Sequence, residues 1–80
     1  MAPLSRLKNL NPNKCKKLLI KHGWESINRN GSHETFIKEI GGVIRTTQLI
    51  WNNKDCHPKN VKNMIEKTDI PVEEWIRNCK

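Results

Sequence analysis

The residues best suited to chemistry are Asn30, Gly31, Ser32 and His33, which are consecutive in the sequence. Asn-Gly is a strong signal for a tight hairpin turn, and glycine lets a phosphate approach the backbone closely. Ser32 can donate a hydrogen bond, and histidine is the side chain that exchanges a proton near neutral pH. RNA cleavage needs such a group, because a base must take the proton from the ribose 2′-hydroxyl before that oxygen attacks the adjacent phosphate. The alternative is a turn that merely ends in a polar histidine.

Cations are needed near such a histidine, because the attacked phosphate gains negative charge. The neighbouring predicted strands carry three cations, Arg29, Lys38 and Arg45. The predicted first helix carries a basic stripe that could contact RNA phosphates. The expected RNA-binding residues are Lys14, Lys17, Lys21, Arg29, Lys38 and Arg45.

The remaining candidates for chemistry have simpler interpretations. His22 falls at the end of the first predicted helix, where a cation is favourable, and His57 directly precedes the helix-opening Pro58. Glu73 and Glu74 form a helix-start pair rather than a pair of catalytic carboxylates. No glycine-rich loop precedes a helix, so nothing in the sequence predicts a nucleotide cradle.

The charge of the chain favours a polyanionic partner. Its 80 residues carry a formal net charge of +7, and residues 1–24 hold six Lys and Arg with no acid. One basic face is typical of proteins that bind nucleic acid, although a merely soluble basic protein would have the same composition. A chain of this length forms one domain and buries too little surface for a deep enclosed cavity.

The three cysteines, Cys15, Cys56 and Cys79, are odd in number and widely spaced. They predict reduced thiols in the cytoplasm, rather than a disulfide framework or a zinc site. No apolar run approaches the roughly 18–20 residues of a membrane helix. We therefore expect a cytoplasmic protein with no metal, no small-molecule cofactor and no membrane partner.

Periodicity predicts an α+β fold with the order α-β-β-β-α-α, in which helices cover one face of a three-stranded antiparallel sheet. Residues 1–10 are expected to form a basic leader, with the docking of Leu4, Leu7 and Leu10 left open, and residues 11–80 a single domain. Trp24 and Trp75 are expected in the core, whereas Trp51 could lie in the core or at the surface. The predicted helices begin at residues 12, 58 and 71, and the predicted strands span residues 24–29, 33–40 and 43–51.

In this order the motifs resemble those of the HicA (YcfA-like) toxins of HicA–HicB toxin–antitoxin modules. The most specific motif is Gly31-Ser32-His33, followed by Phe36 at the usual aromatic spacing. The resemblance runs from about Asn11 to the C-terminus. Its other motifs are KKLLIKHGWE at residues 16–25, NKD at residues 53–55, Pro58 with residues 61–65, and IPVEEW at residues 70–75.

The resemblance implies a fold like that of double-stranded-RNA-binding domains and a metal-independent mRNA endonuclease with His33 as its catalytic acid or base. It also implies a HicB-like antitoxin that covers His33. The chain departs from the family pattern at Glu34 and Trp51, where a histidine is often found, and at Lys59-Asn60, which replaces the usual Gly-Thr. We therefore expect a mechanism with one histidine, and Glu34 on the opposite strand face. The alternatives are a non-catalytic RNA-binding module and a protein that binds an acidic protein partner.

Overall fold

Three strands form one antiparallel sheet in the order β1-β2-β3. In the computed structural model, which describes residues 4–80, they are β1 (Glu25–Asn30), β2 (His33–Ile40) and β3 (Val43–Ile50). The turn between β2 and β3 is Gly41-Gly42, and both glycines have positive φ, as a two-residue hairpin of the type favoured by strand twist requires. The three predicted strands are confirmed, with ends that differ by one residue at β1 and β3.

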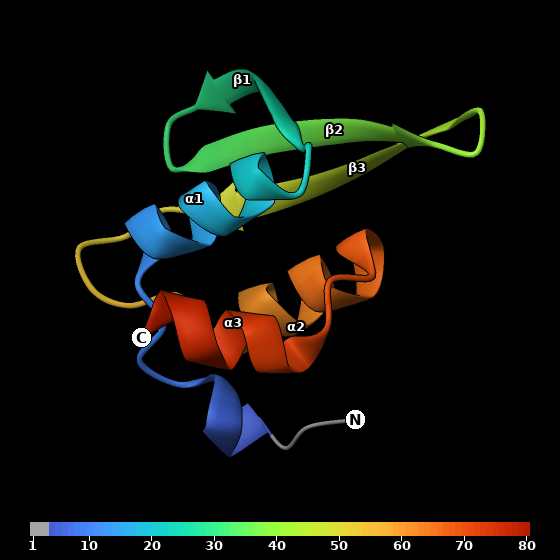
Figure 1. The fold of residues 1–80 in the computed structure, drawn as a ribbon. Helices are drawn as coiled ribbons and strands as arrows, with labels where there is room; N and C mark the ends of the chain where they lie inside the picture. Colours follow the sequence, from blue (N-terminus) through green and yellow to red (C-terminus); the bar gives the residue numbers. More distant parts are fainter. Residues whose placement is uncertain (1–3) are drawn as a thin grey trace.

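The helices lie on one side of this sheet (Figure 1). A 3₁₀ turn, η1 (Leu4–Leu7), precedes α1 (Pro12–Lys21), and α2 (Pro58–Thr68) and α3 (Val72–Cys79) follow the sheet. The predicted α+β fold and its element order are therefore confirmed. The opposite face of the sheet carries no helix in the described part of the chain, and α1 and α3 lie against each other beneath the sheet.

Local sequence explains where the helices begin and end. The Asn11 side chain accepts a hydrogen bond from the Lys14 N–H at 3.2 Å, and Pro12 occupies the first turn of α1. His57 caps α2 in the same way, because its Nδ1 accepts from the Lys59 N–H at 3.1 Å. This contact bears out the interpretation of His57 as a helix-start residue.

The core lies between the helices and the covered face of the sheet. Phe36 and Leu49 face it from β2 and β3, and Trp24 and Trp75 are 2% and 0% exposed, as predicted. Leu7 and Leu10 of the expected leader are also buried, so this segment contributes to the core. The division at residue 10 stays a prediction, and residues 1–3 of the expected leader lie outside the described residues. No helix in the described chain is long and apolar enough to cross a membrane.

The three cysteines meet in this core. Cys15 Sγ lies 3.9 Å from Cys56 Sγ, and all three thiols are free and buried. The contact with Cys56, the contact with Cys79 and burial raise the pKa of the Cys15 thiol, so it stays protonated. Among the described residues, no group of three or more His, Cys, Asp or Glu side chains is arranged to hold a metal ion.

Asn60 closes the free edge of β3. Its side-chain amide donates to the Gln48 carbonyl at 2.9 Å, and its side-chain oxygen accepts from the Ile50 N–H at 3.1 Å. One side chain thus takes the place of a neighbouring strand for two backbone groups. Because Asn60 is buried at the start of α2, this contact also fixes α2 against the sheet.

Candidate functional site

His33 is the first residue of β2 and follows a two-residue hairpin turn. Asn30 pairs with His33 across the hairpin, so the turn itself is Gly31-Ser32 and Asn30 belongs to β1. Gly31 has a φ of +64°, as the first position of a type II′ turn requires. The hairpin is therefore as predicted, with its turn one residue later than the Asn-Gly signal suggested. Asn30, Gly31, Ser32 and His33 are all exposed.

Both carbonyls of this turn are held by neighbouring residues. The Trp51 N–H donates to the Ser32 carbonyl at 2.6 Å, and Arg29 Nε donates to the Gly31 carbonyl at 3.2 Å. The Arg29 guanidinium also lies over the Trp51 ring, 4.8 Å from its centroid. These contacts fix the turn, and with it the position of the His33 backbone at the start of β2.

Glu34 lies on the covered face of the sheet and is 3% exposed. Its Oε2 accepts from Lys16 Nζ at 2.9 Å and from Ser26 Oγ at 2.6 Å. Its Oε1 accepts from Trp51 Nε1 at 2.9 Å. Since β2 alternates, exposed His33 points away from this network, as expected from the sequence. Glu34 and Trp51, the two positions where the family often has a histidine, are therefore in direct contact here.

Two opposing effects act on the Glu34 carboxyl. Burial favours the neutral acid, but the hydrogen bonds from Ser26, Lys16 and Trp51 favour the carboxylate and together outweigh burial. The pKa of Glu34 consequently lies below its ordinary value. A buried carboxylate thus holds the Trp51 ring in place beside the turn.

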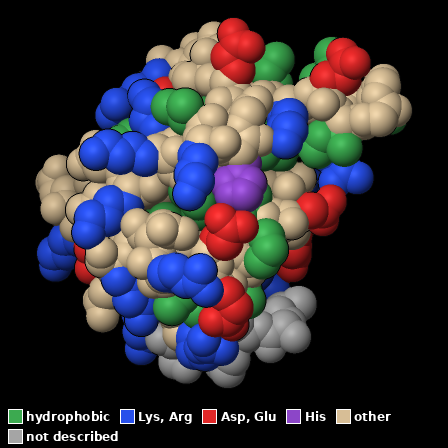
Figure 2. Space-filling model, in the orientation of Figure 1, with side chains coloured by type: hydrophobic (Ala, Val, Ile, Leu, Met, Phe, Trp, Pro, Cys, Tyr) green, Lys and Arg blue, Asp and Glu red, His purple; other side chains and the backbone are tan. Residues whose placement is uncertain are grey.

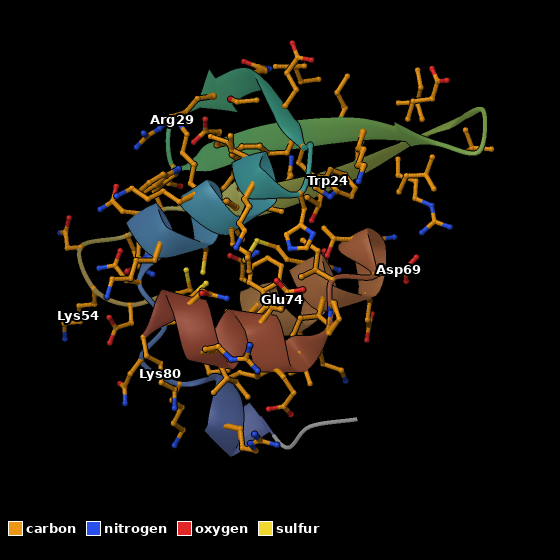
Figure 3. All side chains as sticks on the ribbon, viewed as in Figure 1. Trp24, Arg29, Lys54, Asp69, Glu74 and Lys80 are labelled. Atoms are coloured by element: carbon orange, nitrogen blue, oxygen red, sulfur yellow. The ribbon has the colours of Figure 1, made fainter. Side chains whose placement is uncertain are left out.

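Two of the expected RNA-binding cations lie far from His33. Lys38 and Arg45 pair with each other five ladder positions beyond the His33–Ile50 pair, a distance of roughly 17 Å along the strands. Lys38 Nζ donates to the His22 carbonyl at 2.6 Å, and the Arg45 guanidinium contacts Asp69 at 2.7 Å. In Figure 3 Arg29 and Asp69, the partner of Arg45, lie on opposite sides of the view. The structure thus brings Arg29 to the His33 turn, but not Lys38 or Arg45.

The other three expected cations lie on the outer face of α1. Lys14, Lys17 and Lys21 are exposed and, with Leu18 and Asn78, line one shallow hollow. Lys14 Nζ donates to the Lys80 carbonyl at 2.6 Å. Figure 2 shows Lys and Arg side chains gathered over and beside α1. This basic face is separate from the open sheet face to which His33 points.

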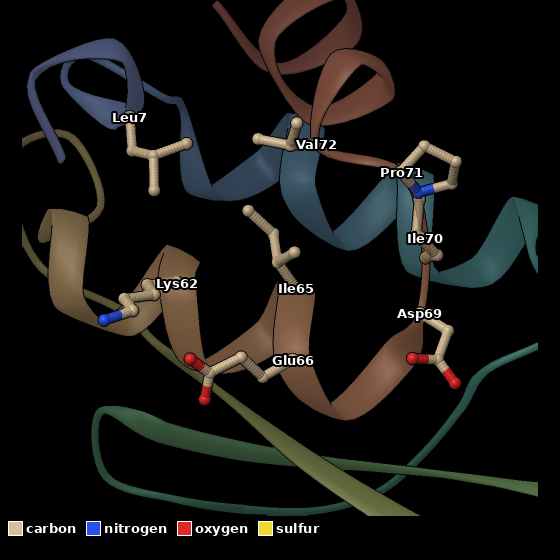
Figure 4. A pocket seen from close by; sticks show the side chains of 8 residues that line it. All are labelled: Leu7, Lys62, Ile65, Glu66, Asp69, Ile70, Pro71 and Val72. Carbon is tan, nitrogen blue, oxygen red and sulfur yellow. The ribbon is translucent and has the colours of Figure 1, made fainter. Parts of the chain in front are cut away.

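His22 and the apolar cavity near η1 both lie apart from the His33 turn. His22 Nε2 lies 2.9 Å from Glu74 Oε1 and joins the end of α1 to α3, in addition to its expected place at the helix end. An apolar cavity of about 300 Å³ lies between η1, α2 and the start of α3, with Leu7, Ile65 and Val72 in its wall (Figure 4). It is lined by none of the candidate catalytic residues.

Sequence reasoning missed Lys16 and Ser26, the partners of Glu34. A signal was present, because Glu34 is two residues from Phe36 and so shares its covered strand face. A carboxylate on that face needs donors. The register that brings Ser26 and Trp51 to it depends on the β-bulge in β1 and on the full β2–β3 pairing.

The chain is thus a small, basic α+β protein that presents an exposed histidine directly after a fixed hairpin turn. The comparison with protein families gives the particular family. A family model described as "HicA toxin of bacterial toxin-antitoxin" matches residues 12–70, and the chain belongs to the HicA toxin family. It is therefore a toxin of a toxin–antitoxin system, and a partner antitoxin is implied. Searches of curated proteins and of solved structures returned no significant match.

Proposed function

We propose that this toxin is an mRNA endonuclease that acts in the cytoplasm and uses His33 as its catalytic acid or base. The observation that carries the proposal is an exposed histidine, next to a glycine-serine turn whose two carbonyls are both held. Membership of the HicA toxin family supports it, because that family model covers the whole turn.

The proposed reaction needs only one histidine. His33 takes the proton from a ribose 2′-hydroxyl, and the resulting oxygen attacks the adjacent phosphorus. The 5′ oxygen leaves and takes a proton from water, and the hydroxide that forms takes the proton from His33. The products are a 2′,3′-cyclic phosphate and a 5′-hydroxyl. Since the substrate supplies the nucleophile, the step requires no metal ion. Gly31 and Ser32 offer their backbone N–H groups to the phosphate, and Arg29, whose Nε donates to the Gly31 carbonyl, supplies a positive charge beside the turn.

The basic face of α1 would contact RNA phosphates outside the cleavage site. Lys17 and Lys21 are exposed there, and Lys14 lies beside them. A HicB-like antitoxin is proposed to neutralise the toxin by covering His33. Strand alternation directs exposed His33 away from the face of buried Glu34, toward the sheet face over which no described helix lies.

The test is induced expression in bacterial cells, with growth and intact mRNA followed together. The wild type should arrest growth and lose mRNA, and His33→Ala should do neither. His57→Asn is the matched control, because it removes another exposed histidine but keeps a side chain that can cap α2. Arrest by His33→Ala equal to that of the wild type would contradict the proposed role of His33.

A second candidate is a non-catalytic RNA-binding module on the same fold. It is favoured by one observation: Glu34 and Trp51, at positions where a histidine is common in the family, are committed to each other. This candidate predicts that the accumulated wild-type protein binds RNA with steep salt dependence and leaves it intact.

A further inference from the structure

A hollow of about 310 Å³ lies at the outer end of the β1–β2 hairpin. It opens beside the turn that precedes His33, on the side where β3 ends. We call it the hairpin hollow, and it is lined by Arg29, Gly31, Ser32, Trp51, Asn52 and Asn53. Its volume is at the small end of the range for ligand pockets, which suits one planar group rather than a folded segment.

A fixed aromatic ring forms one wall. The Trp51 indole is partly exposed and anchored through Nε1 to the buried Glu34 carboxylate. The Arg29 guanidinium lies over this ring, and its Nε donates to the Gly31 carbonyl, so both side chains are held before any ligand arrives. Aromatic rings and guanidinium planes are the surfaces on which proteins stack unpaired bases. Because Trp51 and Arg29 are already positioned, little ordering cost would oppose such stacking.

Two amide side chains form the other wall. Asn52 Oδ1 accepts from the Lys54 N–H at 2.7 Å, which orients this amide and leaves its NH₂ group to donate. Asn53 is exposed beside it. Side-chain amides hydrogen-bond to base edges, whereas phosphates are bound mainly by cations and backbone N–H groups. The hollow therefore combines a stacking surface with groups that contact the edge of a base.

We propose that the hairpin hollow binds one unpaired base of an RNA strand, stacked against Trp51 and Arg29. The inference rests on the proposed function in naming RNA as the ligand. A base in the hollow brings its own sugar and phosphate to the Gly31-Ser32 turn, next to His33. A base within a duplex is stacked between its neighbours and cannot enter, so the hollow selects single-stranded RNA.

The test compares an intact RNA oligonucleotide with an abasic oligonucleotide of the same length and charge. Both carry a 5′ fluorophore, and binding is measured by anisotropy with protein that carries His33→Ala to prevent cleavage. In this background Trp51→Leu should weaken binding of the intact strand at least about fivefold. The abasic strand should bind both proteins equally weakly. Trp51→Phe, which keeps a ring, should recover most of the lost affinity for the intact strand.

Equal weakening of both strands by Trp51→Leu would overturn the inference, because it would show lost folding or lost charge rather than lost stacking. Unchanged binding of the intact strand would overturn it as well. Intrinsic fluorescence gives a second readout, since Trp24 and Trp75 are buried. The intact strand should quench Trp51 more than the abasic strand does. If base-dependent binding is found but the wild type does not cleave RNA, the nuclease proposal fails and the hairpin hollow stands.

Discussion

Replacement of Glu34 by glutamine tests the network beneath the His33 turn. The carboxylate accepts on Oε2 from Lys16 and Ser26, and on Oε1 from Trp51. Glutamine has the same shape but only one acceptor, and its NH₂ group is a donor. Whichever way the amide is turned, a donor faces a donor, and at least one hydrogen bond to a buried group is lost.

The expected loss of stability follows from these contacts. A hydrogen bond to a charged group contributes about 1.5–3 kcal/mol. The Lys16 side chain is 36% exposed, so its ion pair with Glu34 is screened by solvent and adds little to this figure. In the less costly orientation Trp51 still donates to the amide oxygen and the Ser26 hydroxyl rotates to accept from the NH₂ group, but both hydrogen bonds become neutral and fall to about 0.5–1.5 kcal/mol each. The substitution should therefore cost about 2 kcal/mol. For a domain of this size that lowers the melting temperature by about 8–16 °C.

The assay is thermal unfolding followed by circular dichroism. Glu39→Gln is the matched control, because it makes the same substitution on the same strand at an exposed position. Glu39→Gln should melt within a few degrees of the wild type. If Glu34→Gln melted together with Glu39→Gln, the reasoning about the buried carboxylate would be wrong.

Three further predictions follow from named contacts. First, folding lowers the pKa of Glu34 below its ordinary value of about 4.5. The carboxylate therefore stabilises the fold at pH values above about 4.5, and this stabilisation is lost as the pH falls through the lower pKa of the folded state. The stability difference between wild type and Glu34→Gln in urea denaturation should shrink below about pH 4.5, and a constant difference would refute this. Second, Asn60→Ala should cost about 1–3 kcal/mol in the same assay, because it unpairs two backbone groups at the β3 edge, whereas Asn63→Ala, exposed on the same helix, should cost little. Third, the double variant Lys17→Gln, Lys21→Gln should make the fall of log RNA affinity with log salt concentration less steep by about 2. An unchanged slope would place the RNA-binding face elsewhere.

The elements of the fold could be predicted because their signals are local. Asn11-Pro12 and His57-Pro58 each combine a capping side chain with a proline suited to a first helical turn. The glycines at both hairpin turns adopt the positive φ that their sequence context indicated. Such signals act within a few residues, so they need no knowledge of the tertiary structure.

The surroundings of the site were harder to predict because they depend on pairing between distant residues. Trp51 reaches Glu34 across 17 positions of sequence, and only the β2–β3 register shows that they meet. Lys38 looked like a cation for the site, but its alternation with Phe36 places it on the covered face. Its partner, the His22 carbonyl, lies at the end of α1, and this contact becomes visible only in the folded molecule.

Cleavage of a defined RNA oligonucleotide by the purified protein tests whether His33 catalyses attack by the ribose 2′-hydroxyl. The products should carry a 2′,3′-cyclic phosphate, and a single 2′-deoxy nucleotide at the cleaved position should abolish cleavage, because it removes the proposed nucleophile. His33→Ala should bind the same oligonucleotide and leave it intact. Cleavage of the 2′-deoxy substrate would rule out the 2′-hydroxyl as the nucleophile, and unchanged cleavage by His33→Ala would rule out His33 as the catalytic residue.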